Sequence, residues 1–244
     1  MTHPSPYRSK IKIFLDGAER AAMVEMAPNP LIQGFTTNPS LMKKAGVKDY
    51  PGFCKEILTQ LQSKPVSFEV FADDFQEMKR QAKEIASWDR GDGSVYVKIP
   101  IMNSKGESSI PLIEELSNAG VKLNVTALFT LKQVWDTCHA VRKGAPSIVS
   151  VFAGRIADSG RDPMPLMQAA AELCLSTGPQ VELLWASTRE AFNIVQAEMV
   201  GCKIITAPGD LIKKVSGFNR DLMDLSLDTI RTFKKDSEAA GFSL

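Results

Sequence analysis

Short apolar runs alternate with longer amphipathic stretches along almost the whole chain. The runs are rich in β-branched and aromatic residues, which is typical of buried strands, and the stretches between them carry apolar residues at helical spacing. Strands are therefore predicted at 12–16, 34–37, 66–70, 95–99, 123–128, 147–152, 181–186 and 203–206.

A helical stretch follows each predicted strand. Ser40 can cap the second helix, which begins at Leu41, and a loop of Gly, Asp and Arg is expected after Phe152. The helices are predicted at 17–26, from 41 onward, and at 74–88, 109–118, 131–141, 164–175, 189–199 and 210–215.

These eight strand–helix units carry no signals for antiparallel hairpins. Parallel strands need right-handed crossovers, and eight such units favour a closed (β/α)8 barrel, the TIM barrel of the α/β class, over an open doubly wound sheet. We predict a single barrel domain over residues 1–244. Residues 1–10 form a flexible extension in this prediction, and 218–240 form an extra C-terminal amphipathic helix that covers the barrel or reaches a neighbouring subunit.

Composition narrows the class of protein. A chain of 244 residues with 44% hydrophobic residues can bury a large core. Lys and Arg (29) nearly balance Asp and Glu (28), and no basic stripe with interleaved aromatics is present, so we expect no nucleic-acid partner. No run approaches the roughly 18 apolar residues of a membrane helix, and the start lacks a signal-peptide core, so we expect no membrane partner and a cytoplasmic location.

Cysteine and histidine usage excludes several mechanisms. The cysteines lie far apart and form no Cys-x-x-Cys pair, which argues against a zinc site or a disulfide framework. The histidines are His3, near the start, and His139, in a helical stretch, so a Ser-His-Asp or Cys-His mechanism is not expected. Chemistry here is expected to use lysine and carboxylates. The four cysteines are Cys54, Cys138, Cys174 and Cys202.

Lys98 occupies an unusual place for a lysine, inside the predicted strand 95–99 that Pro100 ends. Burying an ammonium group without a partner is costly, and a common escape is to keep the amine neutral near pH 7. A neutral amine attacks a carbonyl to form a Schiff base. The alternative is a strand-end lysine that snorkels to water or pairs with a carboxylate.

Polar residues stand at almost every predicted strand end, which is where the active site of such a barrel lies. Pairs two residues apart, such as Asn124 with Thr126, project to one side of a strand. Local alternatives exist: Thr36 and Asn38 as turn or cap residues, Asp16 as a helix cap, and Arg155 paired with Asp158 on the surface. The strand-end residues are Asp16, Thr36, Asn38, Glu69, Lys98, Asn124, Thr126, Ser150, Arg155, Ser187 and Arg189.

Five motifs together resemble the transaldolase family, in order and over nearly the whole barrel. The lysine position agrees, since this family carries its Schiff-base lysine on strand four, whereas most other Schiff-base aldolases on barrels carry it on strand six. The motifs are FTTNPS at 35–40, VKIP at 97–100, LNVT at 123–126, FAGRI at 152–156 and ASTR at 186–189.

The resemblance implies catalytic roles. Lys98 would condense with a ketose carbonyl, and Asp16 would take the hydroxyl proton whose loss drives carbon–carbon cleavage. Glu69, through a water held by Thr126, would move protons during imine formation and hydrolysis. No metal or organic cofactor is implied, because the protonated imine is the electron sink.

The resemblance also implies a substrate site. Asn38 and Asn124, with Ser150 beside them and Thr36 nearby, would hold hydroxyls of a dihydroxyacetone unit, and Phe152 would also line the substrate site. A clamp of Arg155, Ser187 and Arg189 would bind the terminal phosphate of a sugar phosphate. The implied enzyme acts in the pentose phosphate pathway of carbohydrate metabolism, and we expect a homo-oligomer.

Two behaviours occur in the family: transaldolases pass the dihydroxyacetone unit to an acceptor aldose, and fructose 6-phosphate aldolases release it. Glu69 and Phe152 match the transaldolase pattern, where the aldolases typically have glutamine and tyrosine, so we favour a transferase. The alternatives that stay open are the simple aldolase, an aldolase acting on a sulfonated ketose, a phosphate-binding isomerase that forms no imine, and a silent sugar-phosphate-binding protein.

Overall fold

The computed structural model describes residues 7–61 and 64–241. The chain forms two compact units. One lies within residues 9–212, and the other is formed by the two terminal segments, of which residues 7–8 and 213–241 are described. Most of the predicted N-terminal extension, residues 1–6, lies outside the described residues.

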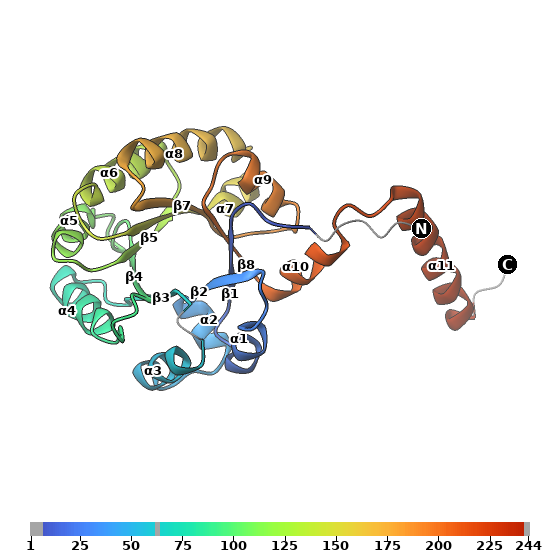
Figure 1. Cartoon of the computed structure of the whole chain (residues 1–244), viewed down its shortest axis with the longest axis horizontal. Coiled ribbons are helices and arrows are strands. Elements are labelled where there is room, and N and C mark those ends of the chain that lie inside the picture. Colours follow the sequence, from blue (N-terminus) through green and yellow to red (C-terminus); the bar gives the residue numbers. More distant parts are fainter. Residues whose placement is uncertain (1–6, 62–63, 242–244) are drawn as a thin grey trace. The chain divides into compact units, whose positions relative to one another are not determined.

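Eight parallel strands close into a barrel in which each strand pairs with the next and the last pairs with the first (Figure 1). This confirms the predicted (β/α)8 barrel. The strands are β1 (Lys12–Asp16), β2 (Ile32–Thr36), β3 (Val66–Glu69), β4 (Val95–Pro100), β5 (Leu123–Leu128), β6 (Ser147–Val151), β7 (Val181–Trp185) and β8 (Ile204–Ala207).

Helices alternate with the strands and surround them (Figure 1). Side-chain caps fix the starts of two of them. Asp74 accepts hydrogen bonds from the backbone N–H groups of Gln76 and Glu77, and Thr130 forms a capping box with Gln133. The helices of residues 9–212 are α1 (Arg20–Met26), α2 (Pro39–Lys44), α3 (Tyr50–Gln60), α4 (Phe75–Ala86), α5 (Ile110–Asn118), α6 (Leu131–Val141), α7 (Ala153–Asp158), α8 (Met164–Thr177) and α9 (Asn193–Met199), followed by α10 (Gly209–Lys213) and a 3-10 turn (Lys214–Gly217).

The structure corrects three local predictions and adds one helix that was not predicted. Ser40 is not a cap: the Asn38 side chain accepts a hydrogen bond from the backbone N–H of Leu41, and α2 begins at Pro39. The segment after Phe152 was expected to be a loop, because it is rich in residues that favour turns. Its first part, Ala153–Asp158, is instead helix α7. Helix α3 was not predicted, and α9 starts at 193 instead of 189 because residues 190–192 form a bend and a turn.

An apolar layer fills the middle of the barrel. Phe14, Ile148, Leu184 and Ile204 from four strands pack together with Ala186, and Tyr96 and Phe152 lie against them. Gly34 on β2 makes room for the Phe14 ring, because a Cβ atom there would lie 2.6 Å from it. Side chains alternate along a strand, so the residues two positions further on face the same interior, nearer the carboxyl ends.

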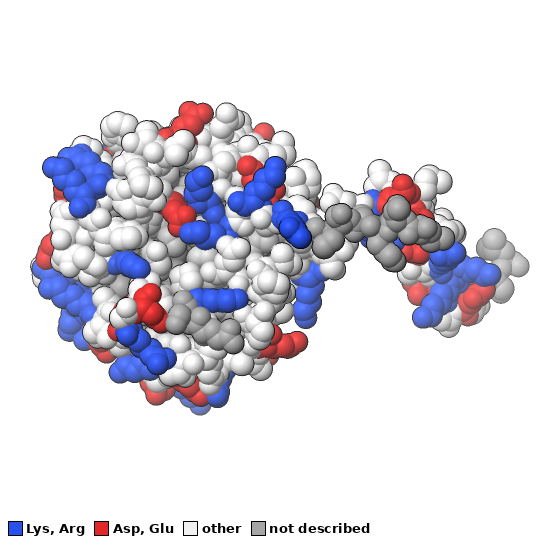
Figure 2. Space-filling view, in the orientation of Figure 1, with Lys and Arg blue, Asp and Glu red and all other residues white. Residues whose placement is uncertain are grey.

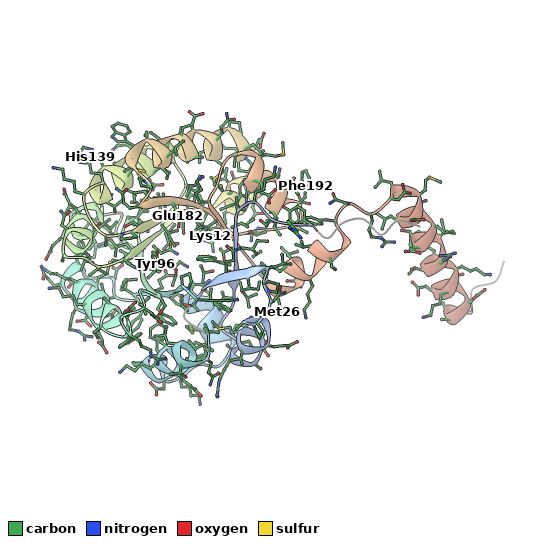
Figure 3. The ribbon with its side chains drawn as sticks, viewed as in Figure 1. Lys12, Met26, Tyr96, His139, Glu182 and Phe192 are labelled. Carbon is green, nitrogen blue, oxygen red and sulfur yellow. The ribbon has the colours of Figure 1, made fainter. Side chains whose placement is uncertain are left out.

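The opposite end of the barrel interior holds an ion pair. Lys12 Nζ lies 2.9 and 2.7 Å from the carboxylate oxygens of Glu182. Figure 3 places Lys12, Glu182 and Tyr96 inside the ring of strands, whereas His139 lies outside it on α6. The two ends of the barrel therefore carry different polar groups, separated by the apolar layer.

The surface carries both signs of charge. On the face shown in Figure 2, Lys and Arg side chains are mixed with Asp and Glu and form no continuous stripe. In the described ranges, no helix is long and apolar enough to cross a membrane. The four cysteines are all free thiols and all buried.

The second unit contains the C-terminal helix α11 (Leu222–Ala240). Asp221 caps its start, Gly241 ends it in a left-handed conformation, and the rings of Tyr7 and Phe218 meet edge to face at 5.0 Å. No residue of α11 is buried, and its apolar side chains are exposed. The predicted helix is confirmed over 222–240, and what it packs against stays a prediction.

Candidate active site

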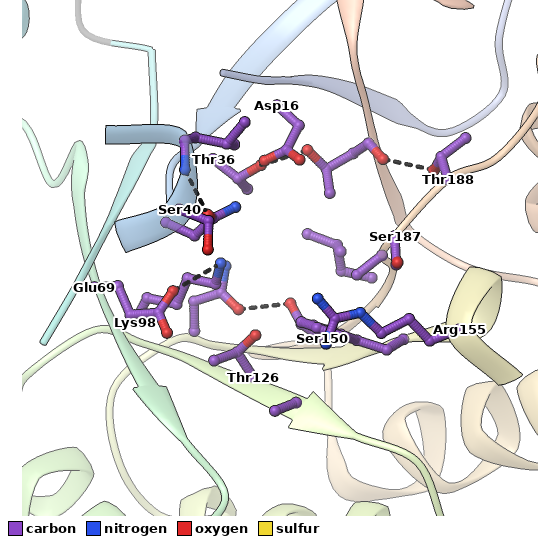
Figure 4. Close-up of a pocket in the computed structure, with 18 of the residues that line it drawn as sticks. Asp16, Thr36, Ser40, Glu69, Lys98, Thr126, Ser150, Arg155, Ser187 and Thr188 are labelled. Atoms are coloured by element: carbon purple, nitrogen blue, oxygen red, sulfur yellow. Dashed lines mark hydrogen bonds and ion pairs between the residues drawn. The ribbon is translucent and has the colours of Figure 1, made fainter. Parts of the chain in front are cut away.

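A cavity of about 600 Å³ lies at the carboxyl ends of the strands (Figure 4). Every one of the twelve residues that the sequence singles out as catalytic or substrate-binding lines it. The structure thus brings together side chains that come from seven of the eight strands or the segments following them. They are Asp16, Thr36, Asn38, Glu69, Lys98, Asn124, Thr126, Ser150, Phe152, Arg155, Ser187 and Arg189.

Strand register explains why the central three residues are neighbours. Lys98 on β4 pairs with Glu69 on β3 on one side and with Asn124 on β5 on the other. Residues at paired positions of adjacent strands project their side chains to the same face. A carboxylate, an amine and an amide therefore stand in a row along one level of the barrel interior.

Lys98 has two partners. Its Nζ lies 3.1 Å from Oε2 of Glu69 and donates a hydrogen bond to the backbone carbonyl of Thr37 at 3.0 Å. Only 8% of the Lys98 side chain and 16% of the Glu69 side chain are exposed. The sequence left open whether Lys98 is a buried neutral amine or a lysine that reaches water or pairs with a carboxylate. The structure shows that Lys98 has a carboxylate partner, Glu69. This contact also allows a proton to pass directly between Lys98 and Glu69.

Asp16 lies partly buried at the end of β1. Thr36 donates a hydrogen bond to its Oδ1 at 2.7 Å. Burial raises the pKa of Asp16 above the ordinary value of 3.8, while the charge of Lys98 and the hydrogen bond from Thr36 act in the opposite direction. Asp16 is not a helix cap, since Glu19 occupies the N-cap position of α1. A carboxylate with a raised pKa is suited to accept a proton.

Asn124 is held in one orientation by two buried hydroxyls. Its Nδ2 donates to Ser67 Oγ at 2.9 Å, and its Oδ1 accepts from Ser150 Oγ at 2.6 Å. All three residues are almost fully buried. One hydrogen of the Nδ2 group remains for a ligand, because an amide nitrogen has two. Ser67 was not predicted, although it precedes Glu69 by two positions and so faces the same interior.

Thr126 presents a hydroxyl to the cavity. Within residues 7–61 and 64–241 this buried oxygen has no hydrogen-bond partner, which suits it to hold a water or a substrate hydroxyl. The next residue, Ala127, has φ of 62°, and the β5–β6 register shifts between Val125 and Leu128. Strained backbone and bulges of this kind are common beside active sites.

Two arginines line the cavity beyond β6 and β7. Arg155 extends from α7 toward the middle of the cavity in Figure 4, and its guanidinium carbon lies 5.1 Å from the centre of the Phe152 ring. Arg189 binds Asp158 through Nε at 3.1 and 3.0 Å and through Nη2 at 2.6 Å. The alternative for Arg155, a surface pair with Asp158, is not what the structure shows, because Arg189 makes that pair instead. The hydrogen bonds from Arg189 hold the pKa of Asp158 below the ordinary value.

A close approach of backbone positions these arginines. A Cβ atom on Gly154 would lie 1.7 Å from the carbonyl oxygen of Ser187, so only glycine allows α7 to meet the loop after β7. Ser187 itself adopts a left-handed conformation with φ of 64°. The backbone N–H of Arg189 donates to Asn193 Oδ1 at 2.9 Å, which fixes the other side of the loop.

Several residues that line the cavity were not predicted from the sequence. Thr206 on β8 and Thr188 after β7 are the polar ones with buried side chains. Thr206 follows the interior-facing Ile204 by two positions, and this alternation could have revealed it. The others are Pro39, Ser40, Leu41, Ala127, Leu184, Ala186 and Pro208.

Comparison with known proteins assigns the family. The profile of the Transaldolase/Fructose-6-phosphate aldolase family matches residues 13–244. The chain belongs to this family. A probable transaldolase of Methanococcus maripaludis (strain C5) is 36% identical over 229 residues, which cover 94% of this chain and 98% of that protein. A probable transaldolase of Thermoanaerobacter sp. (strain X514) is 32% identical over 234 residues, covering 96% and 100% of the two chains.

We predict that Gly154→Ala destabilises the protein, even though alanine is the better helix former. The new methyl group meets the Ser187 carbonyl, and relieving an overlap of this kind costs about 1–3 kcal/mol or more. Gly209→Ala is the matched control: it lies in α10, its Cβ would be 3.5 Å from Leu15, and helix propensity favours alanine by up to about 1 kcal/mol. Urea unfolding measures both, and a Gly154→Ala protein as stable as Gly209→Ala would contradict the assignment.

Proposed function

We propose that this protein is a transaldolase that transfers a dihydroxyacetone unit from a ketose phosphate, such as fructose 6-phosphate, to an aldose phosphate through a Schiff base on Lys98. The observation that carries the proposal is the placement of Lys98 beside Glu69, in one cavity with Asp16. The family and the names of the relatives support the same reading.

Schiff-base formation begins with a proton transfer. Glu69, 3.1 Å from the Lys98 nitrogen, can take a proton from the ammonium group and leave a neutral amine. The amine adds to the ketose carbonyl, and the resulting carbinolamine loses water to give the protonated imine. Glu69 supplies the proton for that water, and the Thr126 hydroxyl holds the water in place.

Carbon–carbon cleavage requires a base at the adjacent hydroxyl of the sugar. Asp16 takes that proton, the carbon–carbon bond breaks, and the electron pair moves into the imine to give an enamine on Lys98. The aldose leaves, and the enamine adds to the aldehyde of the acceptor in the reverse sequence of steps. Asp16 then returns the proton to the new hydroxyl. Water held by Thr126, with Glu69 moving its protons, hydrolyses the imine, which releases the product ketose and restores the Lys98 amine. The protonated imine accepts the electron pair during cleavage, so no metal or organic cofactor is needed.

Binding groups surround this centre on two sides. Asn38, Asn124 and Ser150 hold the hydroxyls of the three-carbon unit, and the fixed orientation of Asn124 aims its free amide hydrogen. Arg155, Ser187 and Arg189 bind the terminal phosphate at the outer end of the cavity. We further propose that the enzyme acts on sugar phosphates of the pentose phosphate pathway in the cytoplasm, as a homo-oligomer.

Lys98→Met is expected to abolish both turnover and borohydride trapping, because methionine fills the same space without an amine. The wild-type protein, incubated with fructose 6-phosphate and borohydride, should gain the mass of the reduced adduct at Lys98. Lys12→Met is the control, since that lysine lies at the opposite end of the barrel interior and should leave trapping intact. Trapping that persists in Lys98→Met would identify another lysine and refute the mechanism, and no trapping in wild type would favour a non-covalent isomerase or binding protein.

Replacing Arg155 or Arg189 by alanine is expected to weaken binding of phosphorylated sugars by about 1.5–3 kcal/mol, the scale of a charge-assisted hydrogen bond. Binding of uncharged fructose should change little. Calorimetric titration of fructose 6-phosphate and fructose measures the difference in both variants. An unchanged preference for the phosphorylated sugar in both would show that the anion binds elsewhere.

Phe152→Tyr is expected to raise release of dihydroxyacetone relative to transfer. Release requires the enamine carbon to be protonated and water then to hydrolyse the resulting imine before the enamine adds to an acceptor aldehyde. A phenolic hydroxyl in this cavity can donate that proton or orient that water. A difference of about 1.4 kcal/mol between the two barriers changes the partition tenfold. The ratio of free dihydroxyacetone to transferred product, measured with saturating erythrose 4-phosphate, gives the partition. A wild type that mostly releases dihydroxyacetone under these conditions is an aldolase.

A further inference from the structure

Two threonine hydroxyls connect Asp16 to the strand that closes the barrel. Thr36 Oγ1 donates to Asp16 Oδ1 at 2.7 Å and lies 2.5 Å from Thr206 Oγ1. The Thr206 hydroxyl also lies 3.4 Å from the backbone carbonyl of Phe14. Thr36 is 2% exposed and Thr206 5%, so protein groups and not bulk water satisfy these hydroxyls.

The number of protons fixes the direction of each hydrogen bond. An ionised carboxylate only accepts, and each hydroxyl has one proton to donate. When Asp16 is ionised, Thr36 gives its proton to Asp16, so Thr206 must be the donor in the contact between the two threonines. The chain of donation then runs from Thr206 through Thr36 to Asp16, and donors linked in this way strengthen one another.

The same chain can serve the protonated acid by reversing. A protonated Asp16 donates to Thr36, Thr36 donates to Thr206, and Thr206 turns its proton to the Phe14 carbonyl. Each threonine hydroxyl keeps an acceptor in both states, so proton uptake by Asp16 leaves neither hydroxyl proton unpaired.

Strand pairing and a hydrogen bond from Thr188 hold Thr206 in place. It pairs in register with Phe14 across the β8–β1 contact, and its own backbone carbonyl accepts a hydrogen bond from Thr188 Oγ1 at 2.6 Å. The hydroxyl therefore has a fixed origin on a strand, and no ligand contact is required to place it.

We propose that Thr206 is a positioning residue for the reaction, which acts through Thr36 to orient Asp16 and to support it in both its ionised and its protonated state. This inference rests on the proposed function only in giving Asp16 the role of proton acceptor. The hydrogen-bond chain itself belongs to the free protein.

The charges around Asp16 set the direction of the expected effect. Lys98 on β4 favours the ionised form, and the other charged groups lining the cavity are Glu69, which pairs with Lys98, and Arg155 and Arg189. Hydrogen bonds that end on a carboxylate are roughly twice as strong as those between neutral groups, so losing Thr206 harms the ionised state more. Removing the Thr206 hydroxyl should therefore raise the pKa of Asp16 and move the acid limb of activity to higher pH.

Titration of the Asp16 carboxyl carbon by 13C NMR tests the chain in the free protein, with Asp16→Asn used to assign the signal. Thr206→Val replaces the hydroxyl by a methyl group of similar size, and Thr206→Ser retains the hydroxyl but loses the methyl group. We expect the protonation constant of Asp16 to rise about two- to fivefold in Thr206→Val and to stay near wild type in Thr206→Ser. Thr36→Val, which removes the direct donor, should give a larger rise.

The acid limb of kcat/KM for sugar cleavage should shift with the NMR midpoint in each variant. Thr206→Ala gives a second hydroxyl-free variant if Thr206→Val fails to fold. A midpoint unchanged in the hydroxyl-free variant, or shifted equally by Thr206→Ser, overturns the inference. A failure of the proposed function is distinguished from a failure of this inference by borohydride trapping. Wild-type protein that is not trapped contradicts the proposed function, whatever the titration of Asp16 shows.

Discussion

The contact between Lys98 and Glu69 is the interaction on which the site depends. Removing two charges from water is costly, and such a pair persists only when geometry and further hydrogen bonds compensate. Here the register of β3 and β4 sets the two side chains at the same level, and the Thr37 carbonyl accepts an additional hydrogen bond from the amine. The rest of the cavity is arranged around this pair, with Asn124 on one side and Asp16 across the interior.

The barrel could be predicted from the sequence because its strands are regular. Apolar runs with polar ends mark the strands, and the alternation of side chains brings those polar ends into one cavity once the barrel closes. Lys98 is the clearest case, since a lysine inside the run 95–99 is hard to explain as a surface residue. The pattern of apolar and polar positions predicted only that these residues lie at the strand ends. The family resemblance was needed to predict their catalytic and binding roles.

Residues outside the regular strands could not be predicted in this way. Asp158 pairs with Arg189 because a short helix and a distant loop approach each other at Gly154, and no local pattern encodes that approach. Asn38 shows a different difficulty, since it is both a helix cap and a cavity residue, so the two alternatives drawn from the sequence did not exclude each other. Thr206 lies within a strand and was missed for another reason: one threonine in an apolar strand resembles an ordinary core residue, although its alternation with Ile204 places it on the interior face.

The cavity is built on two kinds of support. Its inner groups stand on hydrogen-bonded strands, whereas the arginines come from a helix of six residues and the loop that it meets. Local opening takes least free energy where few backbone hydrogen bonds must break. Amide hydrogen exchange should thus be slow along the strands and faster around Arg155 and Arg189. A sugar could then enter or leave by a fluctuation of the outer rim while Lys98, Glu69 and Asp16 keep their mutual geometry.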